Sequence, residues 1–319
     1  MPRTAATTAT ALATTLALTL TACSTPRTPH HDEERPLVLT TFTVLADMTR
    51  NIAGNRLQVA SLTRPGAEIH GYEPTPDDLV RGNEADLILQ NGLGLETWLT
   101  QFTDQIHAPT HTLTEGIDTI PITSGNHQGQ PNPHAWMSPD NGPTYVDNIQ
   151  KALTELDPED AHHYEQTAQN YKTDITQVGT DLHNALTEVP EHTRALVTCE
   201  GAFSYLARDT GLTETYLWPT NAENEGTPQQ IASVTQFVED NDIPTVFCET
   251  TVNDSAQQAV ARDTGAHMGE PLYVDSLSPP EGPVPTYLDL LRHDAQAITQ
   301  GLTPTQPPNN QDEKEDHQE

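Results

Sequence analysis

The chain has 319 residues, and its 14 Lys and Arg face 46 Asp and Glu, for a formal net charge of -32. So few basic residues cannot neutralise a phosphate backbone, which excludes nucleic acid as a partner. The length has room for about two domains that each bury a core. We interpret most of the carboxylates as a solvated acidic surface, which keeps the protein soluble and attracts cations weakly.

The first 23 residues have the pattern of a targeting segment. Arg3 provides the positive charge, residues 11–20 form a short run of Ala, Leu and Thr, and small residues precede Cys23. This end resembles the lipobox of bacterial lipoproteins, which implies that Cys23 is lipidated and anchors the mature chain to the outer face of the cytoplasmic membrane. An ordinary cleaved secretory signal is the alternative. The run is too short to span a bilayer, and both interpretations place the protein outside the cytoplasm.

A tether and then a first lobe are expected after this signal. Residues 24–35 are polar and contain two prolines, as in a flexible linker, and residues 36–157 are assigned to the lobe. Thr75 is expected to cap a helix that has Pro76 at its first position. The other expected helices are 44–53 and 95–102, and the expected strands are 37–43, 57–62, 86–90 and 119–122. This alternation predicts βαβ units and a parallel sheet.

A long helix is expected to connect this lobe to a second one. Residues 158–190 contain a single glycine, Gly179, and no internal proline. Their apolar positions are sparse, as in a helix that bridges two domains rather than lying in one core. At about 1.5 Å per residue, roughly thirty residues make a stiff connection of about 45 Å.

The second half, residues 191–302, repeats the alternation. Its expected strands are 194–199, 215–218, 243–248 and 267–274, and its expected helices are 201–209, 227–241, 253–264 and 284–299. The fold class is therefore α/β, with two Rossmann-like lobes, each a parallel sheet flanked by helices, joined by one long helix. Residues 303–319 are rich in Pro, Gln, Asn, Asp and Glu and are predicted to be disordered.

The two remaining cysteines, Cys199 and Cys248, are expected to form a disulfide. They are an even number in an oxidising compartment. Each ends an apolar run, and two neighbouring parallel strands would bring those ends close enough to bridge. Two buried free thiols are the alternative.

Two histidines are candidate metal ligands because the chain around them is stiff. His134 lies between Pro133 and Trp136, so backbone restriction and ring packing hold its imidazole in place. His70 lies in a loop rich in glycine and proline beyond the end of a strand, where open α/β sheets bind ligands. Loop packing is the alternative explanation for the proline-bracketed His134 alone.

Two carboxylates in the second half occupy equivalent positions. Glu200 directly follows the strand that ends in Cys199, and Asp275 directly follows Leu272-Tyr273-Val274. Both are therefore expected at the carboxyl ends of strands, facing the crevice between the lobes. Helix capping or solvent exposure would explain either carboxylate alone.

Several motifs occur together in one order along the chain. They are residues 65–78 with "YEPTPDD", 132–138 with "PHAW", 199–205 with "EGAFSY", 224–230 with "NEGTPQQ", and Asp275-Ser276-Leu277. With them the chain resembles the substrate-binding proteins of metal ABC transporters, the manganese- and zinc-binding lipoproteins, over roughly residues 36 to 302. The resemblance implies a metal held between two lobes by His70, His134, Glu200 and Asp275. It also implies a permease and an ATPase as partners, and we expect a monomer.

The chemistry of these four groups is also consistent with a divalent metal site when the family resemblance is left aside. Two neutral imidazoles and two carboxylates have a net charge of about -2, which balances a divalent ion. The absence of thiolates disfavours copper(I) and structural zinc. Four protein ligands leave little room for an activated water, unlike a catalytic zinc site with an open position. The site is therefore expected to hold and release an ion.

Within the family, zinc binding goes with a histidine as third ligand and a long His-rich loop. Here the third ligand is Glu200 and the loop is short, which favours Mn(II), with Fe(II) next, although Zn(II) generally binds more tightly at equal ligands. The local loop at Trp218-Pro219 is a further departure. The alternative from a different class is an extracytoplasmic zinc metalloenzyme with Glu200 or Asp275 as general base. The sequence does not support it, because it contains no H-E-x-x-H motif. A role in cell adhesion would be compatible with metal capture.

Overall fold

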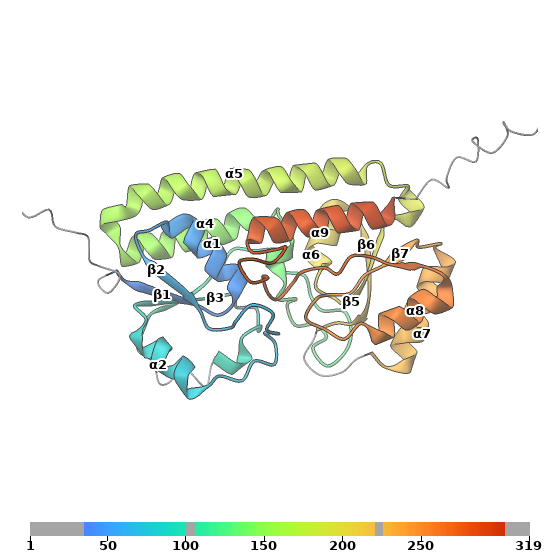
Figure 1. Cartoon of the computed structure of the whole chain (residues 1–319), viewed down its shortest axis with the longest axis horizontal. Coiled ribbons are helices and arrows are strands. Elements are labelled where there is room, and N and C mark those ends of the chain that lie inside the picture. Colours follow the sequence, from blue (N-terminus) through green and yellow to red (C-terminus); the bar gives the residue numbers. More distant parts are fainter. Residues whose placement is uncertain (1–34, 100–105, 221–225, 304–319) are drawn as a thin grey trace, which may run out of the picture. The chain divides into compact units, whose positions relative to one another are not determined.

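The computed structural model describes residues 35–99, 106–220 and 226–303. Within them strands and helices alternate along the chain (Figure 1). The predicted signal, the lipidation of Cys23, nearly all of the tether and residues 304–319 of the predicted tail lie outside these ranges. So does the end of the helix expected at 95–102, whose described part contains the 3-10 turn η1 (Thr97–Leu99).

The first half contains a four-stranded parallel sheet in the order β2-β1-β3-β4. Its strands are β1 (Leu37–Thr40), β2 (Gln58–Ser61), β3 (Leu87–Gln90) and β4 (Thr110–Thr112), and its helices include α1 (Thr43–Ala53) and α2 (Pro76–Glu84). The strand expected at 119–122 is wrong, because Pro121 makes only an isolated antiparallel bridge to Pro131. Proline cannot donate to a ladder. The edge strand of the sheet is instead β4, with the sequence Thr-His-Thr. It is short and partly exposed, so its sequence contains no apolar run that would predict a strand.

Helix α4 (Gly142–Leu156) was not anticipated from the sequence. Its inward face repeats at helical spacing through Tyr145, Ile149 and Leu153, all fully buried. Pro143 lies in its first turn, as is common at a helix start.

The long helix is present as α5 (Ala161–Leu186), 26 residues flanked by the 3-10 turns η3 (Pro158–Asp160) and η4 (Glu191–Thr193). It runs alongside α4 and α9 (Tyr287–Leu302) and also packs on α1 (Figure 1). One stripe is buried, including Tyr164, Tyr171 and Ile175. The sparse apolar pattern therefore reflects a helix with one covered face that spans both halves.

The second half has two parallel strand pairs. They are β5 (Ala195–Glu200) with β6 (Thr213–Trp218), and β7 (Thr245–Val246) with β8 (His267–Met268). The Phe247 N–H donates to Val197 O at 2.8 Å, which places β7 beside β5. The strand expected to run to Val274 ends at Met268, because Pro271 interrupts the ladder before pairing resumes at the bridge from Leu272 to Glu249.

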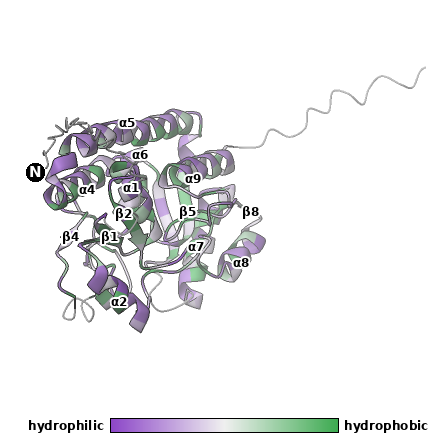
Figure 2. Cartoon of the chain, turned by 60° about the vertical axis from the view of Figure 1, so that its left-hand side comes forward, coloured by the Kyte–Doolittle hydropathy of each residue, from purple (hydrophilic) through white to green (hydrophobic). Residues whose placement is uncertain are grey.

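Three further helices cover these strands: α6 (Ser204–Thr210), α7 (Pro228–Asp240) and α8 (Ser255–Thr264). Thr75 and Thr227 each form a capping box at the start of a helix, and the Thr75 cap was predicted. Figure 2 shows hydrophobic residues gathered on the strands and hydrophilic residues along helices such as α8. No helix in the described ranges has the length and apolarity needed to cross a membrane.

Trp136 connects the two halves through a shared core. Its indole N–H donates to Val274 O at 3.1 Å, and its own carbonyl accepts the hydroxyl of Tyr287. All of these groups are buried. The segment that follows His134 and the segment that precedes Asp275 in the predicted site are thus held against each other.

Candidate metal centre

The loop that carries His70 is held at several backbone atoms. The indole N–H of Trp98 donates to Ile69 O at 3.1 Å. The Glu68 carboxylate accepts the His70 N–H at 2.6 Å and the Gly71 N–H at 2.9 Å. These contacts fix the backbone on both sides of His70 and direct its ring inward.

His134 directly precedes the 3-10 turn η2 (Ala135–Met137), as its N-cap residue, and is fully buried. As expected from the sequence, Trp136 packs beside it, with ring centroids 5.2 Å apart. Burial, and then the charge of His70, hold the pKa of His134 well below its usual range. The imidazole is therefore neutral, the form that binds metals.

Of the two carboxylates, Glu200 comes from the end of a strand, as predicted, whereas Asp275 follows an isolated bridge, because β8 ends at Met268. Glu200 is the last residue of β5, and Asp275 follows the bridge at Leu272 by three positions. Both are fully buried. The Thr251 hydroxyl donates to Asp275 Oδ2 at 3.4 Å.

The structure brings all four predicted ligands together. One ligand atom each from His70, His134, Glu200 and Asp275 lies within 4.8 Å of the others. The two Nε2 atoms are 3.0 Å apart, and Glu200 Oε1 lies 3.3 Å from that of His70 and 3.4 Å from that of His134. Atoms bound to one divalent ion at about 2.1 Å lie about 3.0 to 3.4 Å apart for angles between a right angle and the tetrahedral angle. The donor set therefore fits a single ion.

Burial of the four groups is unequal. The side chains of His134 and Glu200 are inaccessible, and that of His70 is 7% exposed. Among the four candidate ligands, His70 is thus the one whose side chain reaches solvent.

A third carboxylate, Glu249, lies beside the site and was missed in the sequence. Both of its oxygens are 3.3 Å from the Glu200 N–H, which donates to them. Burial, and next the charge of Glu200, raise the pKa of Glu249 well above its usual range. Glu249 could have been found from the sequence, because the dipeptide Cys-Glu occurs twice, at Cys199-Glu200 and at Cys248-Glu249.

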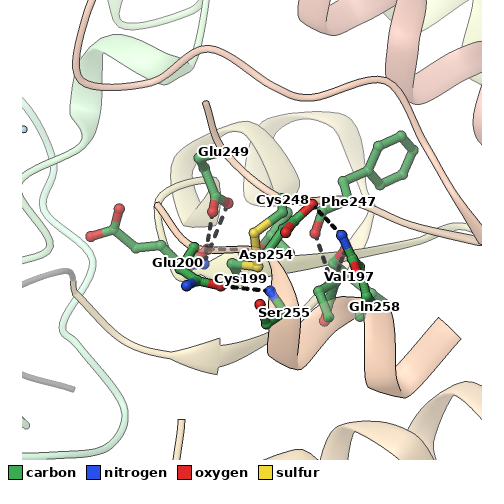
Figure 3. The surroundings of a disulfide bond; sticks show 12 residues. Val197, Cys199, Glu200, Phe247, Cys248, Glu249, Asp254, Ser255 and Gln258 are labelled. Carbon is green, nitrogen blue, oxygen red and sulfur yellow. Dashed lines mark hydrogen bonds between the residues drawn. A yellow bond between two sulfur atoms is a disulfide. The ribbon is translucent and has the colours of Figure 1, made fainter. Parts of the chain in front are cut away.

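The structure bonds Cys199 to Cys248, with a Cα–Cα distance of 4.9 Å. Figure 3 shows the bridge beside Glu200 and Glu249, with the Glu200 side chain pointing away from it. The disulfide ties the ends of β5 and β7 together at the residues that immediately precede the two glutamates.

A two-lobed α/β fold that brings two imidazoles and two carboxylates together is typical of proteins that bind a divalent metal ion. The family described as zinc-uptake complex component A, periplasmic (ZnuA), matches residues 38–301. The chain therefore belongs to this family, and the resemblance identified from the motifs is confirmed.

Relatives and solved structures agree with this assignment. Iron-binding protein YfeA of Yersinia pestis is 46% identical over 283 residues, 88% of this chain and 91% of that protein. The manganese ABC transporter substrate-binding lipoprotein PsaA of Streptococcus anginosus is 29% identical over 294 residues, 90% of this chain and 95% of that protein. The structure of a Mn-bound periplasmic metal binding protein from Candidatus Liberibacter asiaticus has a TM-score of 0.78 at 40% identity and covers 84% of this chain and 100% of that chain. The predicted fold class is confirmed.

Proposed function

We propose that this chain is an extracytoplasmic receptor that captures Mn(II) and delivers it to the permease of an ABC transporter. The observation that carries the proposal is the convergence of His70, His134, Glu200 and Asp275 on one small volume. Their two carboxylates would offset the charge of a divalent ion, and three of the four groups are fully buried. A relative named as a manganese ABC transporter lipoprotein supports the same role.

The choice of Mn(II) rests on the donor set. Carboxylate oxygens suit Mn(II), whereas thiolates, which favour copper(I) and structural zinc, are absent from the four groups. Fe(II) is the second candidate, because the relative at 46% identity is named an iron-binding protein. Zn(II) is the competitor, since it binds nitrogen and oxygen ligands more tightly than Mn(II) in general.

Binding and release, rather than catalysis, suit this arrangement. Glu200 and Asp275, the two candidates for a general base, are both members of the ligand set. The neighbouring Glu249 is turned toward the Glu200 backbone and not toward the histidines. An enzyme would need a base and an open coordination position in addition.

We further propose the anchoring and the lobe organisation expected from the sequence. Lipidated Cys23 would hold the receptor at the outer face of the cytoplasmic membrane, where a monomer would meet its permease and the ATPase would act behind it. Lobes at 36–157 and 191–302 would enclose the ion, with 158–190 as the connection.

The test is metal content followed by thermal melting of the metal-free protein with Mn(II), Fe(II) or Zn(II) added separately. A ligand that binds only the folded state raises Tm according to RT ln(1 + [L]/Kd). We expect a large shift with Mn(II) that is lost in His70→Ala and in Asp275→Ala. His162→Ala is the matched control, because that side chain is 91% exposed on α5.

Each other outcome changes the conclusion. A larger shift with Fe(II) would assign iron, and a shift with Zn(II) alone would assign zinc in spite of Glu200. The absence of a shift with all three metals would contradict the receptor function.

A further inference from the structure

The side-chain amide of Asn132 contacts both halves of the candidate site. Asn132 is 3% exposed and lies two residues before His134. Its Oδ1 is 3.0 Å from the His134 backbone nitrogen and 2.9 Å from His134 Nδ1. Its Nδ2 is 2.7 Å from Gly201 O and 3.2 Å from the Ser204 hydroxyl.

The neighbours of Asn132 allow one orientation of this amide. A carbonyl such as Gly201 O can only accept, so the NH2 group must face it. The backbone N–H of His134 can only donate, so Oδ1 must face that side. Exchanging the two amide atoms would place donor against donor and acceptor against acceptor.

This orientation determines the tautomer of His134. Because Oδ1 accepts, the Nδ1 atom at 2.9 Å must carry the hydrogen. The lone pair of the neutral ring is then on Nε2, which faces His70 Nε2 at 3.0 Å and Glu200 Oε1 at 3.4 Å. Without Asn132, the Glu200 carboxylate would favour the opposite tautomer, with the hydrogen on Nε2 and the lone pair turned away from the site.

The same amide aligns the two lobes. Gly201, which accepts from Nδ2, directly follows Glu200. The Tyr205 hydroxyl from α6 donates to Asn132 O at 2.7 Å, so the backbone of Asn132 is held from the second half as well. A ligand from one lobe and the residue after a ligand of the other lobe thus share one side chain.

We propose that Asn132 is a positioning residue that fixes His134 as an Nε2 ligand and holds it in register with Glu200. This inference rests on the proposed metal-binding function. Groups that hydrogen-bond to a ligating histidine typically contribute about 10 to 100-fold in metal affinity.

The experiment compares wild type with Asn132→Ala, Asn132→Asp and a control, Asn141→Ala. Asn141 is a buried amide in the same segment that donates to Ala135 O at 3.0 Å. Nitrogen NMR of 15N-histidine-labelled, metal-free protein reports the tautomer of His134, and titration with Mn(II) reports Kd. Thermal melting of each metal-free variant shows that it is folded.

In Asn132→Ala we expect hydrogen on Nε2 of His134 and a loss of Mn(II) affinity of about 10 to 100-fold. Asn132→Asp still accepts from Nδ1 and should restore the tautomer, but it cannot donate to Gly201 O and should recover only part of the affinity. Asn141→Ala should keep both wild-type values.

The assignment would be overturned if the hydrogen stayed on Nδ1 of His134 in Asn132→Ala. It would also be overturned if wild type bound Mn(II) and Asn132→Ala bound it with the same Kd. A wild type that binds no metal would instead refute the proposed function, and the tautomer measurement would still decide whether Asn132 orients His134.

Discussion

The hydroxyl of Ser276 accepts the backbone N–H of Gly66 at 2.7 Å, although 210 positions separate the two residues in the sequence. Ser276 directly follows the candidate ligand Asp275, and Gly66 lies in the loop that leads to His70. The backbone N–H of Leu277, the residue after Ser276, donates to the Thr43 hydroxyl at 2.9 Å. The exposed ligand loop is therefore fastened to the segment that carries a buried ligand.

Removing this contact in Ser276→Ala should accelerate release of the ion. The Gly66 N–H loses its acceptor, at a cost of about 1 kcal/mol, or roughly fivefold in an equilibrium constant. Mn(II) dissociation into excess chelator, followed by stopped flow, measures the rate. Ser278→Ala is the control, because its hydroxyl accepts the Val284 N–H and donates to Pro279 O, both within its own loop. Equal rates in both variants would show that the Ser276 contact does not restrain the loop.

Replacing both bridged cysteines by alanine should destabilise the protein more than it weakens metal binding. A bridge that spans 49 positions restricts the unfolded chain and contributes about 4 kcal/mol in the loop-entropy account. Glu200 keeps its place through the pairing of β5 with Trp218 on β6. Denaturant unfolding of the metal-free Cys199→Ala/Cys248→Ala double variant measures the first effect and Mn(II) titration the second. An unfolding free energy equal to that of wild type would mean that the native protein is not bridged.

Glu214 should make stability fall as pH rises from weakly acidic to neutral. Burial raises its pKa from 4.5 to about 7, while the Ser204 hydroxyl and the Phe203 N–H, which both donate to it, lower the pKa less. A raised pKa means that the folded state binds the proton more tightly than the unfolded state. The stabilisation is therefore complete below pH 4.5 and is lost as pH rises through about 7, a change of about 3 kcal/mol.

Comparison of wild type with Glu214→Gln isolates this contribution, because glutamine can bond to the same two partners without titrating. Unfolding free energies of the metal-free proteins at pH 5, where most of the stabilisation is still present, and at pH 8, where it is lost, should differ less in Glu214→Gln than in wild type. Glu239→Gln, an exposed substitution on α7, should follow wild type. Parallel pH dependence in all three proteins would contradict a raised pKa at Glu214.

The sequence predicted the candidate ligands through local features taken together with the ordered motifs that carry the family resemblance. His134 is stiffened by its neighbours, and Glu200 directly ends an apolar strand whose carboxyl end must face the crevice. The fold class followed from the alternation of strands and helices. The errors in the predicted strands also have local causes. Strand β4 has no apolar run that would mark it, and Pro271 makes β8 shorter than predicted.

Residues that act through contacts distant in the chain were harder to predict. Asn132 has a role only because Gly201 lies opposite it, 69 positions further on. Glu249 lies beside Glu200 because β7 lies beside β5, and which strands become neighbours is not encoded in either strand alone. Helix α4 was a different case, because its buried stripe is regular and could have been found by its period.

The two neighbouring glutamates give the sharpest test of the site. Glu200 Oε1 lies 3.3 Å and 3.4 Å from the two histidine Nε2 atoms, whereas both oxygens of Glu249 face a backbone N–H. Glu200→Gln removes a ligand charge and should weaken Mn(II) binding by at least about 100-fold, more than the loss of an outer partner. Glu249→Gln can still accept the Glu200 N–H and should change Kd by less than about threefold, because a buried acceptor is retained. Isothermal titration of both isosteric variants at one pH decides, and equal losses would mean that the charge of the whole cavity, rather than the four named ligands, holds the ion.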